Sequence, residues 1–284
     1  MSESRASRLS IRHVTGFIYD GIAESSYNEA RMTPLSSSRQ HVLEATLHTS
    51  PIASQLTYLD YFGSAVTAFD LHERHRQLEV TAEALVEVSI SPARDISLSL
   101  EELASPAVVD RYSEYLVARA RTALPDELHK ELSVETKGCD VDQVVAHALS
   151  FVRDRVAYVS GSTHVTTTAL ESWTQKSGVC QDLSHLMISL LRGQRVPARY
   201  VSGYLHPRAD ATVGETVLGQ SHAWVEYFCG EWIGVDPTNG DDIGLQHVVV
   251  AKGRDYGDVP PLKGIYHGAP SRALGVTVEI TKLA

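Results

Sequence analysis

The chain has 284 residues, of which 43% are hydrophobic and 21% are charged, and this composition is typical of a globular protein with one large domain or two small ones. A formal net charge of −10, with no local run of Lys or Arg, disfavours nucleic acid and membranes as partners. The first ten residues lack the apolar core of a signal peptide, and no stretch reaches the roughly 20 apolar residues of a membrane span. We therefore expect a cytoplasmic protein.

Short alternating segments dominate residues 8–92, and turn-forming residues separate them. The clearest segment is ALVEVSI, from Ala84 to Ile90, in which apolar and polar side chains exchange places at every residue or two. Because alternation with a period of two is typical of strands, we predict a β-rich domain over residues 1–95.

After Ser91-Pro92 the apolar residues take helical spacing, so a second domain is predicted over residues 96–284. One amphipathic helix is expected from Val108 to Arg119. A second is expected from Val141 to Val152, with its start marked by Asp140. Further along the chain we predict a helix over 179–192, a strand over 198–205, a polar loop over 206–220, a tight hairpin, and a last strand over 275–281.

The chain has three cysteines, and they lie far apart at positions 139, 180 and 229. An odd number at such spacing fits neither a disulfide framework nor a zinc-binding CxxC pair. We expect free thiols, no metal and no organic cofactor, since no acidic cluster has the spacing of a calcium loop either.

Cys180 has the position of a reactive thiol. It lies in the first turn of the predicted helix GVCQDLSHLMISLL, for which Gly178 is an acceptable N-cap. Leu183 and Met187 follow at helical spacing, so Cys180 shares their inward face. Unpaired N–H groups and the positive end of the helix dipole favour a thiolate there, and the same N–H groups can bind an oxyanion.

A predicted hairpin carries a candidate base and its partner. Two runs of β-forming residues, Ala223–Phe228 and Trp232–Val235, flank a short turn. If the turn is centred on Cys229, opposed residues have numbers that sum to 458, and His222 then lies directly across from Asp236. Their Cβ atoms would be about 5 Å apart, within reach of a hydrogen bond between carboxylate and imidazole.

Cys180, His222 and Asp236 together have the composition of a catalytic triad. The imidazole would take the thiol proton and later deliver it to a leaving amine, while the carboxylate fixes the imidazole tautomer. Such a set transfers an acyl group from a peptide or amide through a thioester. Water as acceptor gives hydrolysis, and an amine as acceptor gives transglutamination.

Several segments resemble the core of the bacterial transglutaminase-like family. They are Gly178-Val179-Cys180-Gln181-Asp182, Arg199-Tyr200-Val201-Ser202-Gly203-Tyr204, Ser221-His222-Ala223-Trp224-Val225-Glu226, Asp236-Pro237-Thr238-Asn239 and the tail from Gly253 to Pro261. Tyr27-Asn28-Glu29, Met32-Thr33-Pro34 and Asp60-Tyr61-Phe62-Gly63 are similar to the N-terminal domain that accompanies this core in bacteria.

The resemblance implies an α+β fold in which a nucleophile helix packs on an antiparallel sheet, as in papain-like enzymes. Members of the family are commonly described as candidate cysteine proteases, which favours a cysteine peptidase or amidase acting on a peptide or protein substrate. Two alternatives stay open: an amine-accepting protein-glutamine transglutaminase, and a catalytically silent interaction module. A second oxyanion donor is sought shortly upstream of the nucleophile, at Gln175 or Trp173. The oligomeric state is not predicted.

Overall fold

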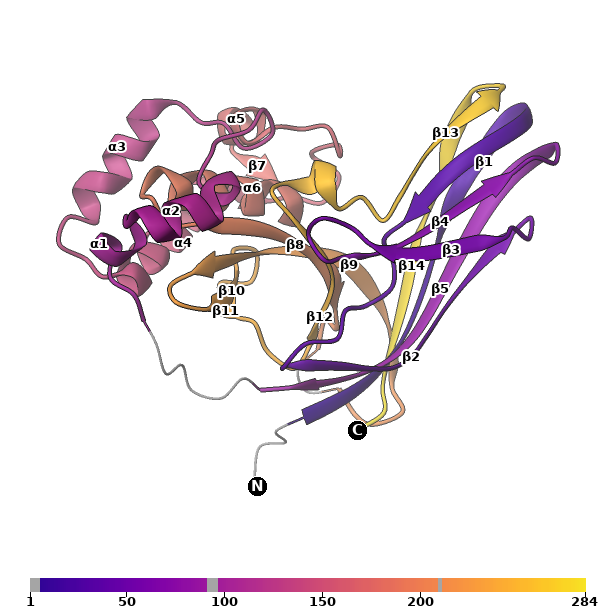
Figure 1. The fold of residues 1–284 in the computed structure, drawn as a ribbon, viewed down its shortest axis with the longest axis horizontal. Coiled ribbons are helices and arrows are strands. Elements are labelled where there is room, and N and C mark those ends of the chain that lie inside the picture. The colour runs from indigo at the N-terminus through magenta and orange to yellow at the C-terminus, as the bar shows by residue number, and fades with distance from the viewer. Residues whose placement is uncertain (1–5, 91–96, 209–210) are drawn as a thin grey trace.

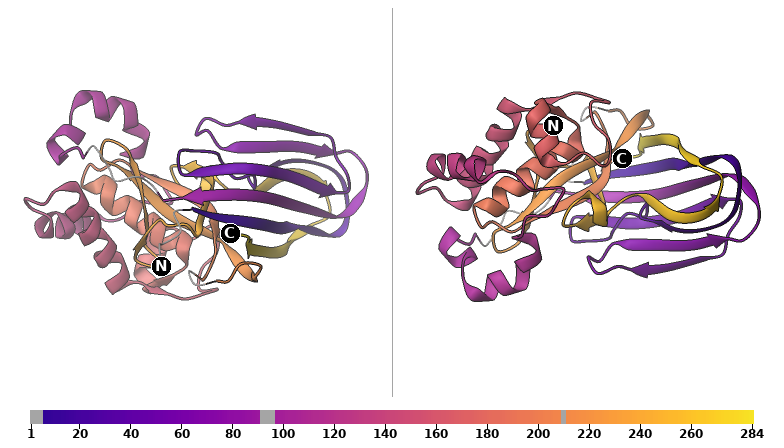
Figure 2. Two further views of the ribbon diagram at one scale, coloured as in Figure 1. Left: turned by 90° about the horizontal axis from the view of Figure 1, so that it is seen from below. Right: turned by 90° about the horizontal axis from the view of Figure 1, so that it is seen from above.

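The computed structural model describes residues 6–90, 97–208 and 211–284, apart from the side chains of Gln220 and Asp241. It has a mixed α+β architecture with two lobes, one of strands alone and one in which helices pack on strands (Figure 1). This confirms the predicted fold class. Figure 2 shows that the helices gather on one lobe while the strands of the other extend away from them.

Antiparallel strands make up most of residues 6–90, so the prediction of a β-rich N-terminal part is confirmed. Their bounds are β1 Ala6–Ala30, β2 Gln40–Ser50, β3 Gln55–Leu59, β4 Ala65–Leu71 and β5 His75–Ser89. Strand β5 shows why: Leu78, Val80 and Ala82 are buried at alternate positions, as a strand with one core-facing side requires.

The end of the chain returns to this lobe. Strands β13 (Leu262–Gly268) and β14 (Ser271–Lys282) both pair with β1. We predicted only the second of them, because the Pro/Gly-rich stretch before it reads as a loop. Since β14 also pairs with β9 (Thr216–Phe228) of the other lobe, one continuous sheet joins the two lobes.

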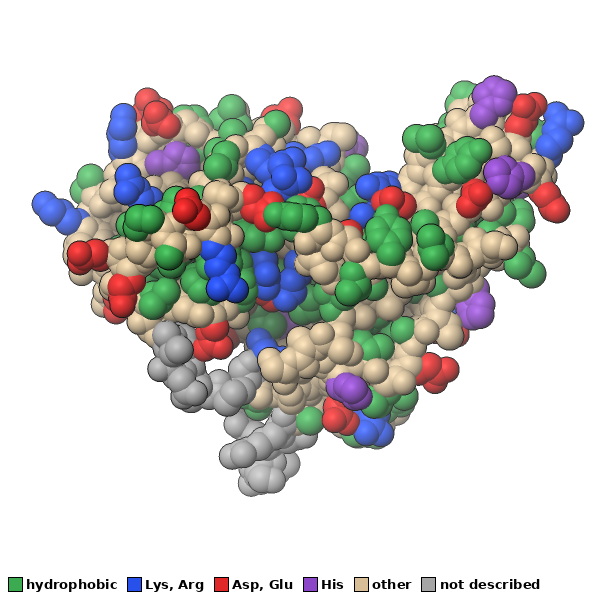
Figure 3. Space-filling model, viewed as in Figure 1, with side chains coloured by type: hydrophobic (Ala, Val, Ile, Leu, Met, Phe, Trp, Pro, Cys, Tyr) green, Lys and Arg blue, Asp and Glu red, His purple; other side chains and the backbone are tan. Residues whose placement is uncertain are grey.

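The helices are α1 Leu100–Leu103, α2 Pro106–Tyr112, α3 Asp126–Glu135, α4 Val141–Arg155, α5 Ala169–Gln175 and α6 Cys180–Gly193, with short 3₁₀ turns η1 Ser113–Tyr115 and η2 Tyr256–Asp258. Asp140 caps α4 with a capping box, as expected. Among the described residues no helix is long and apolar enough to cross a membrane. Figure 3 shows acidic and basic side chains interspersed over one face of the molecule.

The prediction of a single helix from Val108 to Arg119 is wrong. The α-helix ends at Tyr112 and tightens into η1, which ends at Tyr115. Both tyrosine rings pack edge-on against Trp232, with centroids 5.5 and 5.2 Å away. These two contacts hold the chain in a tighter turn than an α-helix would allow.

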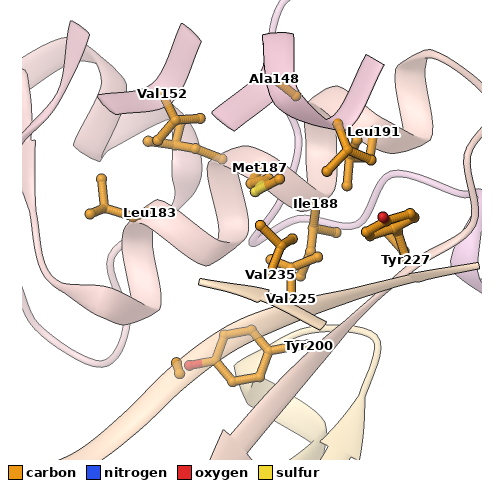
Figure 4. Close-up of a cluster of buried hydrophobic side chains, with 14 of the residues drawn as sticks. Ala148, Val152, Leu183, Met187, Ile188, Leu191, Tyr200, Val225, Tyr227 and Val235 are labelled. Atoms are coloured by element: carbon orange, nitrogen blue, oxygen red, sulfur yellow. The ribbon is translucent and has the colours of Figure 1, made fainter. Parts of the chain in front are cut away.

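The second lobe contains β6 Ala157–Tyr158, β7 Ser177–Gly178, β8 Ala198–Leu205, β9 Thr216–Phe228, β10 Trp232–Asp236, β11 Asp241–Asp242 and β12 His247–Gly253. Helix α6 lies on this sheet, and Figure 4 shows Ile188 of this helix beside Val225 within one cluster of buried side chains. The predicted strand 198–205 is confirmed. The predicted loop 206–220 ends five residues early, because β9 begins at Thr216, where it pairs with β14.

The boundary predicted near Ser91-Pro92 lies outside the described residues. The two lobes also meet at a second place besides the pairing of β14 with β9. Gln40, at the start of β2, is buried against the outer edge of β12. Its Nε2 donates to the carbonyl oxygen of Val249 at 2.8 Å, and its Oε1 accepts the Val249 N–H at 2.8 Å. The amide thus takes the place of a neighbouring strand at this residue.

We expect Gln40→Ala to lower the free energy of unfolding by about 2 kcal/mol, because it leaves the part-buried Val249 N–H without its acceptor. Urea unfolding measures the loss. Gln55→Ala is the matched control: its exposed side chain donates one hydrogen bond to the Leu47 carbonyl, and we expect a change within about 0.5 kcal/mol. Equal losses in the two variants would contradict the role assigned to Gln40.

Candidate active site

Cys180 is the first residue of α6 and is partly exposed. The helix starts one residue later than predicted, since Val179 rather than Gly178 is the N-cap. Asp182 sets this start: its Oδ2 accepts the Val179 N–H at 2.8 Å and the Thr163 hydroxyl at 2.6 Å. A side chain at position 178 would meet Asp182 Cβ at 2.7 Å, so glycine is needed for the close approach.

His222 and Asp236 meet, although not in the predicted register. The turn is centred on Gly230, so that Phe228 opposes Trp232 and paired numbers sum to 460 rather than 458. Extended by one residue, this register places Asp236 opposite Trp224, diagonal to His222. A shift of two in the sum leaves both side chains on the same face, and Nε2 of His222 lies 2.7 Å from Oδ2 of Asp236.

Hydrogen bonds surround the buried carboxylate of Asp236. The following turn supplies three of them: the N–H groups of Thr238 and Asn239 to Oδ1, at 2.8 and 3.3 Å, and the Asn239 amide to Oδ2, at 2.7 Å. His247 adds Nε2 at 3.3 Å from Oδ2. Burial alone would raise the pKa of Asp236, but the bonds to His222 and His247 outweigh it and hold that pKa well below its usual range. Asp236 is therefore an anion.

His222 lies between the carboxylate and the thiol. Burial lowers its pKa, but hydrogen bonds to Asp236 and Cys180, together with their charges, outweigh burial and raise that pKa to about 9. Because Nε2 is occupied by Asp236, Nδ1 is the nitrogen left to receive the thiol proton. The structure thus brings together all three residues that the sequence singled out, in the order thiol, imidazole, carboxylate.

A cleft of about 620 Å³ opens beside His222. Its described lining consists of Tyr158, Leu205, His206, Pro207, Leu218, His222, Thr238, Asn239, Asp242, Gly244, Gln246 and His247. Tyr158 is also close to the nucleophile: burial raises the pKa of Tyr158, and the charge of Cys180 raises it further. Substrate in this cleft would contact His222 directly.

Gln175 and Trp173 contact residues other than Cys180 in the described part of the chain, and their role as oxyanion donors stays a prediction. The side chain of Gln175 is exposed at the end of α5, where Nε2 donates to the Ser177 carbonyl at 3.2 Å. Trp173 stacks on Phe151, with ring centroids 5.7 Å apart and the planes 14° from parallel. Both side chains are engaged in local packing, and proximity in sequence was the sole reason for choosing them.

His247, Asn239 and Tyr158 are site residues that sequence reasoning missed. Asn239 falls in the quoted motif Asp236-Pro237-Thr238-Asn239 but was given no role. Its short distance from Asp236 along the chain was a usable signal, because Asn side chains often bond within turns. Tyr158 and His247 come from distant strands, and no local pattern indicates their position.

His222, Asp236 and His247 form a group, within the described part of the chain, whose ligand atoms all lie within 4.8 Å, close enough to hold a metal ion. The hydrogen bonds argue for another role. Nδ1 of His247 accepts the Gly244 N–H at 3.2 Å, so the ring proton is on Nε2, facing Asp236. A metal at Nε2 would move that proton to Nδ1, against the Gly244 N–H. The group therefore fits a hydrogen-bonded cluster better than a metal centre.

The raised pKa of His222 predicts a pH dependence of stability. Its folded pKa of about 9 lies above the ordinary 6.5, so the stabilisation is complete below pH 6.5 and is lost as the pH rises through 9. We expect a loss on the order of 2–3 kcal/mol between pH 6 and pH 9.5. Urea unfolding at both pH values measures it, and His222→Gln should show a clearly smaller difference. An equal difference in the variant would contradict the shift.

Comparison with known proteins bears on this site. Residues 9–87 match the bacterial transglutaminase-like N-terminal region, and residues 129–237 match the transglutaminase-like superfamily. An uncharacterized protein of Mycobacterium leprae is 42% identical over 98% of this chain and 99% of its own length. A protein-glutamine gamma-glutamyltransferase of Pseudomonas aeruginosa is 32% identical over 34% of this chain and 16% of its own length.

Among solved structures, a candidate cysteine protease from Cytophaga hutchinsonii is similar in fold, with a TM-score of 0.79 and 23% identity over 99% of this chain and 92% of that one. The fold similarity extends over both lobes. The two sequence matches cover the N-terminal strands of the strand lobe and the segment that carries Cys180, His222 and Asp236. The chain therefore belongs to the transglutaminase-like superfamily.

Proposed function

We propose that the protein is a thiol enzyme that transfers acyl groups from peptide or amide substrates, with Cys180 as nucleophile, His222 as base and Asp236 as the residue that orients the base. The observation that carries the proposal is the placement of His222, which hydrogen-bonds to a buried anion on one side and to the thiol on the other. A purely structural histidine has no need of a sulfur partner at a helix start.

The reaction follows from this geometry. Because the raised pKa of His222 keeps the imidazole protonated at neutral pH, the proton of Cys180 already resides on His222 when the sulfur attacks the acyl carbon. The first-turn N–H groups of α6 face the developing oxyanion. His222 then gives the proton to the leaving nitrogen, and the carbon–nitrogen bond breaks to leave a thioester. An incoming water gives a proton to His222 and its oxygen to the acyl carbon, which releases the acid and restores the thiol.

Hydrolysis is the favoured outcome. The cleft beside His222 is lined by Thr238, Asn239, Asp242 and Gln246 as well as by apolar groups, and such a polar surface admits water. Transfer to an amine is the second candidate, and the resemblance of one third of the chain to a protein-glutamine gamma-glutamyltransferase supports it. An interaction module without catalysis is the third candidate.

Incubation with p-nitrophenyl acetate, followed by intact and peptide mass spectrometry, tests the proposal. We expect an acetyl group on Cys180 that disappears with time as water completes the reaction. A glutamine-rich protein with a labelled primary amine then separates transfer from hydrolysis. Acetylation that never reaches Cys180, or that is equal at Cys139, would favour the catalytically silent module.

A further inference from the structure

The donors around Asp236 come from two different parts of the fold. Within the described residues, the five hydrogen bonds to its carboxylate are those from His222, Thr238, Asn239 (twice) and His247. All but the last belong to the β9–β10 hairpin or to the turn that follows it. His247 belongs to β12, on the other side of β8 from β9. Among the described donors to the Asp236 carboxylate, His247 is therefore the one that comes from outside the β9–β10 hairpin and its turn.

Packing against Trp224 and hydrogen bonds at both nitrogens hold the ring of His247 in place. It is 6% exposed, and its edge packs on the fully buried Trp224, with centroids 5.3 Å apart. The Gly244 N–H occupies Nδ1 at 3.2 Å, which leaves the proton on Nε2 for Asp236. A neutral imidazole held in one tautomer donates its proton in one direction. Here Gly244 and Trp224 fix that direction, and neither residue belongs to the turn that follows Asp236.

We infer that His247 is a positioning residue for the proposed reaction: it ties the Asp236 carboxylate to β12 and so keeps Oδ2 directed at His222. The inference rests on the proposed function. Without this bond, the donors left to the carboxylate are His222 and the turn that follows β10, so the carboxylate can rotate toward that turn and Oδ2 points less steadily at His222. His222 then spends less time in the orientation that receives the thiol proton, and Cys180 reacts more slowly.

The test is the second-order rate constant for alkylation of Cys180 by iodoacetamide at pH 7, followed by peptide mass spectrometry on the full chain. His247→Phe keeps the ring but loses both hydrogen bonds, and we expect an approximately tenfold decrease, the loss typical of one hydrogen bond to a charged group. His247→Gln still carries an N–H that can reach Asp236, and we expect it to recover most of the rate.

His75→Phe is the matched control, because His75 is also 6% exposed and also packs edge-on against one aromatic ring, that of Tyr19, at 5.2 Å. We expect the wild-type rate. If His247→Phe does not fold, His247→Asn replaces it, since Asn can accept the Gly244 N–H but is too short to reach Asp236. Thermal unfolding of each variant separates loss of fold from loss of reactivity.

A double-mutant cycle decides whether His247 acts through the carboxylate. In an Asp236→Ala background, His247→Phe should cause no further decrease. A wild-type rate in His247→Phe, or the same tenfold decrease in both backgrounds, would overturn the inference and leave the proposed function standing. A wild-type protein in which Cys180 is alkylated no faster than Cys139 would remove both.

Discussion

His222→Ala is expected to slow acetylation of Cys180 by p-nitrophenyl acetate at least about 10³-fold at pH 7, since the thiol loses both its proton acceptor and the cation that stabilises the thiolate. The buried hydrogen bond to Asp236 and the contact with Cys180 show that no other described imidazole occupies this place. His247, the nearest described alternative on the same carboxylate, has its free proton directed at Asp236 rather than at the sulfur.

His75→Ala is the control for this variant, because it removes an equally buried ring from the strand lobe. It should retain the wild-type rate of acetylation. The measurement is the appearance of acetylated Cys180 by mass spectrometry over time, with circular dichroism to show that both variants are folded. A fall of less than about tenfold in His222→Ala would mean that the sulfur is activated by another group.

Asp236→Asn should cost about 10²- to 10⁴-fold in the same assay. The amide has nearly the shape of the carboxylate, but its NH₂ group must face a donor on one of its sides. Either it opposes the N–H groups of Thr238 and Asn239, or it opposes the donors that converge on Oδ2. In the second arrangement the amide donates to Nε2 of His222, which holds the ring in the wrong tautomer, with its proton on the nitrogen that faces Cys180. In the first arrangement the amide loses the bonds that hold it in its turn.

Asp60→Asn is a control matched in local structure. Its Oδ1 accepts the N–H groups of Phe62 and Ser64, as Oδ1 of Asp236 accepts those of its own turn, but it lies in the strand lobe. Acetylation should be unchanged there, and both variants should lose some stability. If Asp236→Asn acetylates Cys180 at the wild-type rate while unfolding more easily, the carboxylate would be a structural group alone.

The local elements of the site could be predicted from sequence because their signals are local. Apolar spacing after Cys180 predicts α6 to within one residue, and the strand predicted over 198–205 is β8. The hairpin register was less secure. The turn is centred on Gly230, which has a φ of 111°, and not on Cys229 as predicted. His222 and Asp236 still meet because the change of register leaves both side chains on the same face of the sheet.

The parts that could not be predicted depend on contacts between distant segments. His247 reaches Asp236 because β12 pairs with β8, and nothing in the sequence near residue 247 indicates that pairing. The choice of Gln175 and Trp173 as oxyanion donors used distance along the chain alone and stays a prediction. Tyr158 could not be found in that way, because it approaches Cys180 through the parallel pairing of β6 with β7.

The most direct test of the triad is the pH profile of iodoacetamide labelling at each of the three cysteines, in wild type and in His222→Ala. We predict that Cys180 is labelled first from mildly acidic to neutral pH and that this preference disappears in the variant. Labelling of Cys180 and Cys139 at the same rate throughout the profile, or a preference for Cys180 that is unaffected by the loss of His222, would contradict the account.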